Sequence, residues 1–279
     1  MMSAARVFSE AKQTEMFRLA AYEPATFGCA GDLLSPSQVR TFMDCQARWF
    51  FKYVERLPDP QTSSLALGKA VHAAIAENFA QKIETKEDLE LTGVLAIYRE
   101  AWFVEAERTL FREDEDAVAI GKCGEGLVAK YIDELAPLVE PLAVEMPVVG
   151  EIAGVRVRGI IDLIDVDGVI IDLKTRARKP SGVGSDVRFQ LATYQQLTGL
   201  GPVARVDTLV KTKTPQLTQH TIELDEREIE ATQTLYPLAQ KMMHGGVYMP
   251  NRLSNLCSQR NCPFWERCEG EFGGRVGEA

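Results

Sequence analysis

The sequence predicts an α/β domain with an N-terminal helical section. Three observations support this fold class: 46% of the 279 residues are hydrophobic, residues 34–140 carry helical patterns, and residues 141–249 alternate between strand and helix patterns. This hydrophobic content is sufficient for a large core. We therefore expect an arm at 1–33 and a domain at 34–279, divided into a helical section (34–140), a sheet with helices (141–249) and a cysteine-rich tail (250–279).

The helical section begins with a clear start signal. Ser35 is a suitable N-cap and Pro36 occupies the first helical position, so we expect a helix from there to about Leu57, before Pro58 and Pro60. A second helix is predicted by a regularly spaced apolar stripe, Leu67, Val71, Ile75 and Phe79. Residues 85–140 also have helical patterns, and we interpret their acidic stretches as solvated faces.

Strand patterns begin at residue 142. Three strand-like segments are separated by turn signals at Ala153-Gly154 and Asp167-Gly168; they span 142–152, 155–165 and 168–175. A loop rich in Gly, Pro and Ser follows. The remaining predicted elements are a helix at 186–199, strands at 204–214 and 216–224, and a helix at 225–244. This order predicts a mostly antiparallel sheet with a crossing helix.

Charge and hydropathy limit the class of protein. The formal net charge of -9 argues against loose, charge-driven binding to nucleic acid or anionic membranes, so any polyanion site must be local. No window approaches the ~20 consecutive apolar residues of a membrane span. The first thirty residues lack the apolar core of a secretory signal. We expect a cytoplasmic protein that does not contact a membrane.

The predicted hairpin at 159–175 carries charged residues among Ile, Leu and Val: Asp162, Asp172 and Lys174. A two-residue turn would place the two acids on opposite faces. A three-residue loop, with Gly168 in the left-handed conformation, would pair Asp162 with Asp172. It would also gather the apolar side chains on one face, namely Ile161, Leu163, Ile171 and Leu173. This segregation favours the three-residue loop.

Two carboxylates that face each other across neighbouring strands repel unless a cation lies between them. Oxygen ligands of this kind suit Mg²⁺ or Mn²⁺ better than zinc. The alternative is that Asp162 and Asp172 are solvated at a sheet edge and Lys174 merely pairs with them.

The hairpin resembles the motif of the PD-(D/E)XK nuclease superfamily, and within it the RecB-like exonucleases, including those with an iron–sulfur cluster. Asp162 matches the first acid of the motif, with Ile161 in place of the proline. Asp172-Leu173-Lys174 matches (D/E)-X-K.

Two further motifs extend the resemblance over roughly residues 34–274. Gln190 and Tyr194 in QLATY resemble the Q-x-x-x-Y helix motif of RecB-like members, and His72 in GKAVH resembles the helical histidine. Gln190 and Tyr194 share a helix face, and the helical spacing of His72 directs its ring inward. An inward histidine without these motifs would be interpreted as a core residue.

The resemblance implies a restriction-endonuclease-like core, a mixed central sheet flanked by helices, and metal-dependent hydrolysis of DNA. It implies that Mg²⁺ or Mn²⁺ is held by His72, Asp162, Asp172 and the carbonyl of Leu173. Lys174 would orient the attacking water, and Gln190 and Tyr194 would position the DNA strand. Glu145 is either a further acidic ligand or an exposed strand residue.

Basic residues cluster beside the predicted catalytic strand: Lys174, Arg176, Arg178 and Lys179, with Lys211 and Lys213 further along the chain. Such a cluster can bind backbone phosphates, although basic loops are usually only solvated. The resemblance alone implies single-stranded DNA as substrate and a role in recombination, repair, phage or CRISPR-related DNA processing. The competing hypothesis is a catalytically weak DNA-binding or assembly subunit that serves a helicase or a CRISPR integration complex.

Three of the six cysteines lie within twelve residues of the tail: Cys257, Cys262 and Cys268. Clustered thiols in a reducing compartment bind metal more often than they form disulfides. A [4Fe-4S] cluster needs four thiolates, and zinc would accept the same ligands, usually with paired local spacings.

The resemblance implies one cysteine upstream of the core and three after it, and therefore favours the cluster. The candidates for the fourth ligand are Cys29, Cys45 and Cys123. We favour Cys45, which is expected in a helix followed by aromatic residues and matches the family's upstream cysteine. Cys29 lies in a segment without clear order, and Cys123 lies in GKCGEG, which we expect to be flexible.

Overall fold

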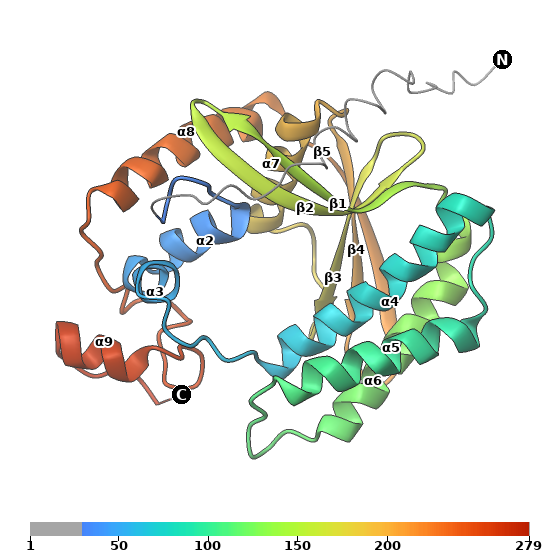
Figure 1. Cartoon of the computed structure of the whole chain (residues 1–279), viewed down its shortest axis with the longest axis horizontal. Coiled ribbons are helices and arrows are strands. Elements are labelled where there is room, and N and C mark those ends of the chain that lie inside the picture. Colours follow the sequence, from blue (N-terminus) through green and yellow to red (C-terminus); the bar gives the residue numbers. More distant parts are fainter. Residues whose placement is uncertain (1–29, 279) are drawn as a thin grey trace.

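A five-stranded sheet forms the centre of the computed structural model, which describes residues 30–278 (Figure 1). The strand order follows the chain: β1 (Pro141–Ile152), β2 (Val155–Asp165), β3 (Ile170–Arg176), β4 (Val203–Val210) and β5 (Gln216–Glu223). β3 and β4 are parallel, because α7 (Ser185–Thr198) crosses between them, and the other pairs are antiparallel. The predicted mixed sheet is confirmed.

The hairpin between β2 and β3 has the predicted three-residue loop. The N–H of Asp165 donates to the carbonyl of Val169 at 3.2 Å, and Gly168 has a φ of 78°. Leu163 faces Ile171, so the same register places Asp162 opposite Asp172. The odd register is confirmed, and its physical reason is the left-handed glycine.

The sheet splits beyond this point, since only two residue pairs join β2 to β3. The freed edge of β2 is met by Leu34, whose N–H donates to the carbonyl of Arg156 at 3.0 Å. The Leu34 carbonyl in turn accepts from the N–H of Arg158 at 2.8 Å. A gap therefore opens between β2 and β3 beyond the pair Leu163 and Ile171, where Asp162, Asp172 and Lys174 lie.

One part of the predicted apolar face is wrong. Leu163, Ile171 and Leu173 share one core cluster, whereas Ile161 packs in the other. The neighbouring strand is distorted beside this position, where Glu145 has a φ of 45°. Ile161 is paired with Met146 on this strand, and the two side chains pack together in the second cluster.

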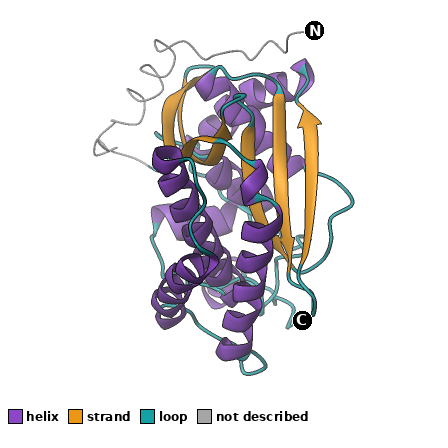
Figure 2. Ribbon diagram, turned by 90° about the vertical axis from the view of Figure 1, so that its right-hand side faces the viewer, coloured by secondary structure: helices purple, strands orange, loops and turns teal. Residues whose placement is uncertain are grey.

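Helices cover both faces of the sheet (Figures 1 and 2). α4 (Ser63–Thr85), α5 (Leu91–Glu107) and α6 (Ala117–Glu134) enclose one core cluster, and the short η2 (Ala136–Leu138) leads from them into β1. The predicted stripe on α4 is fully buried there. α7 packs on the other face, with α8 (Glu226–His244) beside it.

The predicted helix from Pro36 to Leu57 is wrong as a single element. It consists of α2 (Pro36–Asp44), α3 (Gln46–Trp49) and a π-helical turn, η1 (Phe50–Val54), separated at Cys45 by an extended backbone with φ −164° and ψ 112°. The predicted cap is present, as the Ser35 side chain accepts from the N–H of Gln38. The break lets Trp49, which is fully buried, pack on Phe42 and Tyr248.

The segment around Cys123 is not a flexible stretch, because it lies within α6. Gly121 and Gly124 allow close packing there. A Cβ at Gly121 would overlap Trp102, and one at Gly124 would overlap Tyr98. The glycines therefore serve helix packing rather than flexibility.

The cysteine-rich tail contains α9 (Trp265–Phe272), a helix that the sequence patterns did not predict. The predicted arm falls largely on residues 1–29, outside the described residues, as does Cys29. None of the helices between residues 30 and 278 is long and apolar enough to cross a bilayer.

Candidate metal and catalytic site

Every predicted site residue of the hairpin and its neighbours lies around the gap between β2 and β3. The contributing elements are α4 (His72), β1 (Glu145), β2 (Asp162), β3 (Asp172, Leu173 and Lys174) and α7 (Gln190 and Tyr194). The site therefore uses both layers of helices and the sheet between them.

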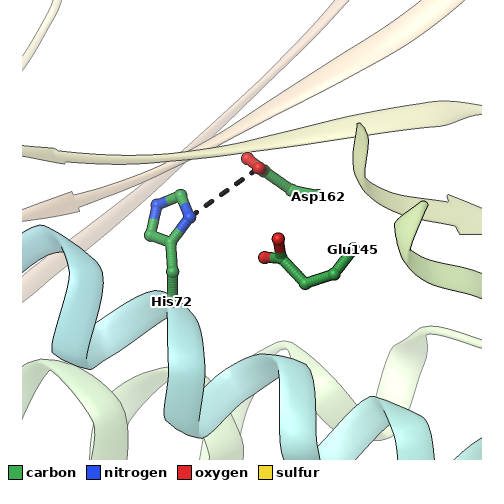
Figure 3. Close-up of side chains that lie close together, drawn as sticks. All are labelled: His72, Glu145 and Asp162. Atoms are coloured by element: carbon green, nitrogen blue, oxygen red, sulfur yellow. Dashed lines mark ion pairs between the residues drawn. The ribbon is translucent and has the colours of Figure 1, made fainter. Parts of the chain in front are cut away.

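Three side chains converge in front of β2 (Figure 3). One ligand atom from each of His72, Glu145 and Asp162 lies within 4.8 Å of the others. The Nδ1 of His72 is 3.7 Å from Oδ1 of Asp162. The strand register places Glu145 directly opposite Asp162, between the paired residues on either side. The sequence left the role of Glu145 open, and only the pairing of β1 with β2 shows that it joins the cluster.

His72 reaches the cluster because α4 lies close to β3. One helical turn before His72, Gly68 faces the sheet, and a Cβ at that position would lie 3.1 Å from Oγ1 of Thr175. The imidazole is a quarter exposed. The expectation that its ring points inward is confirmed.

Asp172 is the most buried acid of the site, with a relative exposure of 2%. Its Oδ1 accepts from Nζ of Lys174 at 2.6 Å and from Nε2 of Gln190 at 3.0 Å. Its Oδ2 is buried and has no hydrogen-bond partner. An unpaired buried carboxylate oxygen is energetically unfavourable unless a cation binds it. Oδ2 of Asp172 is therefore a candidate metal ligand.

The carboxylate of Asp162 is held by the facing strand. Its Oδ2 accepts from the N–H of Leu173 at 2.8 Å. The N–H and carbonyl of a strand residue point to the same edge, so the carbonyl of Leu173 also faces the gap. This direction agrees with its expected role as a metal ligand.

The acids of the site have altered proton affinities. Burial raises the pKa of Asp172 to about 6; Lys174 opposes this shift, and the charge of Asp162 adds to it. Burial and the charge of Asp162 raise the pKa of Glu145 to about 7. Desolvation is the larger cause of both shifts, and the negative charge of Asp162 adds to each; a divalent cation would offset that charge.

Gln190 and Tyr194 form a hydrogen-bond chain that ends on Asp172. Nε2 of Gln190 donates to the hydroxyl of Tyr194 at 3.1 Å as well as to Asp172. The Tyr194 ring lies against Gly159, where a Cβ would overlap it. The two side chains therefore fix the position of Asp172 between β2 and α7.

The two basic segments lie at the same end of the sheet. Arg176 pairs with Val210 at the ends of the parallel strands β3 and β4, and the Lys211 N–H donates to the carbonyl of Arg176 at 2.8 Å. Nζ of Lys211 is turned toward Ser64, at 3.0 Å from its Oγ. The segments thus extend the positive charge beyond Lys174, along the edge of the site.

Four cysteines surround a second, separate cavity, formed where α3 meets the tail: Cys45, Cys257, Cys262 and Cys268. Phe51 and Phe264 pack beside it. Burial raises the pKa of the Cys262 and Cys268 thiols, and the neighbouring cysteines add to the effect. Cys123 lies elsewhere, in α6.

The family model of the PD-(D/E)XK nuclease superfamily matches residues 33–269. The chain belongs to this superfamily. Its mixed sheet with flanking helices has the restriction-endonuclease-like architecture of these nucleases, and the superfamily accounts for the metal-ligand character of the site.

A solved structure shares the fold of this nuclease chain: "Putative exonuclease" from Eubacterium rectale has 15% sequence identity and a TM-score of 0.59, and 92% of each chain is covered. The structure of SSO0001 has 12% identity and a TM-score of 0.44, with 93% of this chain and 94% of that chain covered. A search among curated proteins gives no match.

Proposed function

We propose that this nuclease is a Mg²⁺- or Mn²⁺-dependent exonuclease that hydrolyses single-stranded DNA. Two observations carry the proposal: the converging ligand atoms of His72, Glu145 and Asp162, and the unpaired, buried Oδ2 of Asp172 on the facing strand, which lies outside that group of three. The name of the structural relative from Eubacterium rectale supports the exonuclease activity. The pathway and any helicase, recombination or CRISPR partner stay predictions from the family resemblance.

The donor set fits a hard divalent cation. Three carboxylates, one backbone carbonyl and one imidazole provide mainly oxygen ligands, which suit Mg²⁺ and Mn²⁺. His72, Glu145, Asp162, Asp172 and the carbonyl of Leu173 would hold the ion or ions. When bound, such an ion polarises the scissile phosphate and makes the attacking water more acidic.

Lys174 contributes positive charge at the same place. One of its three N–H groups donates to Asp172, and the others are free to donate to a phosphate oxygen or to orient the attacking water. Gln190 uses both N–H groups within the protein, on Asp172 and Tyr194. We therefore propose that Gln190 acts by positioning Asp172. Lys174, rather than Gln190, would donate hydrogen bonds to the substrate.

The decisive experiment is cleavage of end-labelled linear single-stranded and double-stranded DNA, and of circular single-stranded DNA, with Mg²⁺, Mn²⁺ or EDTA. We expect cleavage of linear single strands only, in the presence of either metal. Asp172→Asn should abolish cleavage, and Lys174→Ala should lower kcat by about 10²–10³-fold. The matched control is Asp167→Asn, an exposed acid in the loop of the same hairpin.

Activity retained in both Asp172→Asn and Lys174→Ala would refute the catalytic assignment. Cutting of the circle would show an endonuclease instead. A folded wild-type protein that binds DNA and cleaves none of these substrates would establish the competing role, a DNA-binding or assembly subunit.

We also propose that Cys45, Cys257, Cys262 and Cys268 hold a [4Fe-4S] cluster. Four thiols around one cavity are the complete ligand set of such a cluster, and the adjacent aromatic rings exclude water. The N–H of Asn251 donates to Sγ of Cys45 at 3.4 Å, an interaction that would stabilise a thiolate.

The spacing of the thiols bears on the choice between iron and zinc. No three of their sulfurs lie within 4.8 Å of one another in the described chain, whereas sulfurs on one zinc ion would be about 3.8 Å apart. The cavity that the cysteines line together with other residues has a volume of about 20 Å³, so side chains of its lining would have to move to admit a cluster. Iron, sulfide and zinc analysis of anaerobically purified protein distinguishes the two metals. We expect brown protein that contains iron and sulfide. Colourless protein that contains zinc would refute the cluster.

A further inference from the structure

A cleft of about 720 Å³ adjoins the catalytic residues and is not explained by the chemistry described so far. Lys174, Gln190 and Tyr194 form its inner end, and Ser35, Ser37 and Arg40, at the start of α2, line its outer end. It lies in the gap where β2 and β3 separate. Its volume is within the range of about 300–1,000 Å³ typical of pockets for small molecules.

One wall of the cleft is an exposed, largely apolar strip of β1 and β2. Pro147 faces Ile160 and Val149 faces Arg158 in the strand register. These pairs follow the pair Glu145 and Asp162 on the same strands, about 7 and 13 Å further along. Ile160 is 54% exposed, an unusual state for a large aliphatic side chain next to a catalytic site.

The cleft also carries positive charge at both ends. Arg40 is paired with Asp186 at 3.3 Å, and Lys174, at the inner end, is paired with Asp172 at 2.6 Å. Arg158 has no ion-pair partner among residues 30–278, so its charge is available to a ligand. Cationic groups at both ends of an apolar surface match a nucleotide within a strand, whose sugar carries a phosphate on either side and a flat base that projects from it.

We propose that this cleft binds the nucleotide next to the scissile phosphate of a single strand, with its base against Pro147 and Ile160 and its outer phosphate on Arg158. The proposal rests on the nuclease function proposed above. It explains how the site would select single-stranded over double-stranded DNA. Only an unpaired, unstacked base exposes the face that this wall would contact. Contact through the face of the base is common to all four bases, so binding is tolerant of sequence.

The test is the binding of a fluorescent single strand in which one abasic nucleotide is moved along the sequence. Full-length Asp172→Asn protein is used so that cleavage does not interfere. We expect one position, adjacent to the scissile phosphate, at which the abasic nucleotide weakens binding by about tenfold. Ile160→Asp, an exposed position, should weaken binding of the intact strand similarly and abolish the effect of the abasic nucleotide.

Arg158→Ala should make the slope of log affinity against log salt concentration less negative by about 0.7, the value for one phosphate contact on a single strand. Two matched controls lie outside the cleft: Arg108→Ala, an exposed arginine after α5, and Leu138→Asp, at an exposed leucine of η2. Neither control should change the binding or its salt dependence.

Equal binding at every abasic position, together with unchanged binding by Ile160→Asp, would overturn the proposal. That result would leave the nuclease function intact if the wild-type protein still cleaves DNA. Conversely, a wild-type protein without cleavage activity but with the abasic effect and its loss in Ile160→Asp would support the cleft and refute the exonuclease.

Discussion

The carboxylate site and the cysteine-lined cavity both gather metal ligands, but different forces hold them in place. In the carboxylate site, Asp162 and Asp172 lie on adjacent strands and their oxygens accept hydrogen bonds from Leu173, Lys174 and Gln190. The site is therefore positioned by the chain itself before any metal binds.

The cysteine-lined cavity joins segments that are distant in the chain, since Cys45 is more than two hundred residues from Cys257. Nδ2 of Asn251 donates to the Asp44 carbonyl at 2.9 Å, and the Asn251 N–H donates to Sγ of Cys45 at 3.4 Å. These contacts position the backbone on either side of the thiols, and aromatic side chains pack around them. A bound group would act there as a cross-link between α3 and the tail. The comparison indicates that loss of metal ligands should affect activity at the first site and stability at the second.

The largest expected effect tests the second half of this comparison. Cys45→Ser should remove colour and iron and lower the free energy of unfolding by about 5 kcal/mol, on the scaling for disulfides that close long loops. Anaerobic purification, iron analysis and denaturant unfolding measure this. Cys257→Ser, Cys262→Ser and Cys268→Ser should behave alike, and Cys123→Ser is the control that keeps iron and stability. Full iron content in Cys45→Ser would refute the ligand assignment.

His72→Ala tests the first half. Because the imidazole is at the edge of the cluster and water can partly replace it, metal affinity should fall about 10–100-fold while the melting temperature changes little. Calorimetric titration with Mn²⁺ and thermal unfolding separate the two effects. His244→Ala, which removes an exposed imidazole paired with Asp32, is the control. An unfolded variant whose folded fraction keeps full activity would instead make His72 a core residue.

The variant Gly159→Ala tests whether Tyr194 and Gln190, which hold Asp172 in place, are packed rigidly. The added Cβ overlaps the ring of Tyr194, so the free energy of unfolding should fall by about 1–3 kcal/mol and cleavage should decrease as Asp172 loses its support. Gly182→Ala, where a Cβ meets nothing within 4 Å, is the matched control. Unchanged stability and activity would show that the Tyr194 ring shifts freely.

The smallest effect is a dependence on pH. The pKa of Asp172, about 6, and that of Glu145, about 7, lie above their unfolded values, so without metal the folded state holds these protons more tightly. Their stabilising contribution is complete below about pH 4 and is lost as the pH rises through 6 to 7. Metal binding competes with the same protons, so the rise in melting temperature caused by Mg²⁺ should increase from pH 5.5 to 8.

Thermal unfolding with and without Mg²⁺ across this range measures the effect. The variant Asp172→Asn, which cannot release a proton there, should have a weaker dependence on pH. Since the side chain of Glu145 is only partly desolvated, whereas Asp172 is 2% exposed, Glu145→Gln should change the dependence less than Asp172→Asn does. A metal-induced shift that is constant from pH 5.5 to 8 in the wild type would contradict the assignment.

Much of the fold followed from local patterns. The apolar stripe of α4 and the strands of the hairpin were predictable because helical and strand periodicities are properties of neighbouring residues. The three-residue loop could be chosen from the sequence, since only one register separates apolar from charged side chains. The break at Cys45 and the helix α9 could not be predicted, as both depend on contacts between the tail and the residues around α3.

The sequence by itself determined the chemical character of the site: two acids and a lysine on a hairpin, with a histidine and a glutamine on neighbouring helices. Only the tertiary structure decided which further residues join them. Glu145 is brought into the cluster by the pairing of β1 with β2, and the cleft exists because β2 and β3 separate after two residue pairs. Strand pairing and splitting are contacts between distant segments, and the pattern of residues along one segment does not encode where its partner ends.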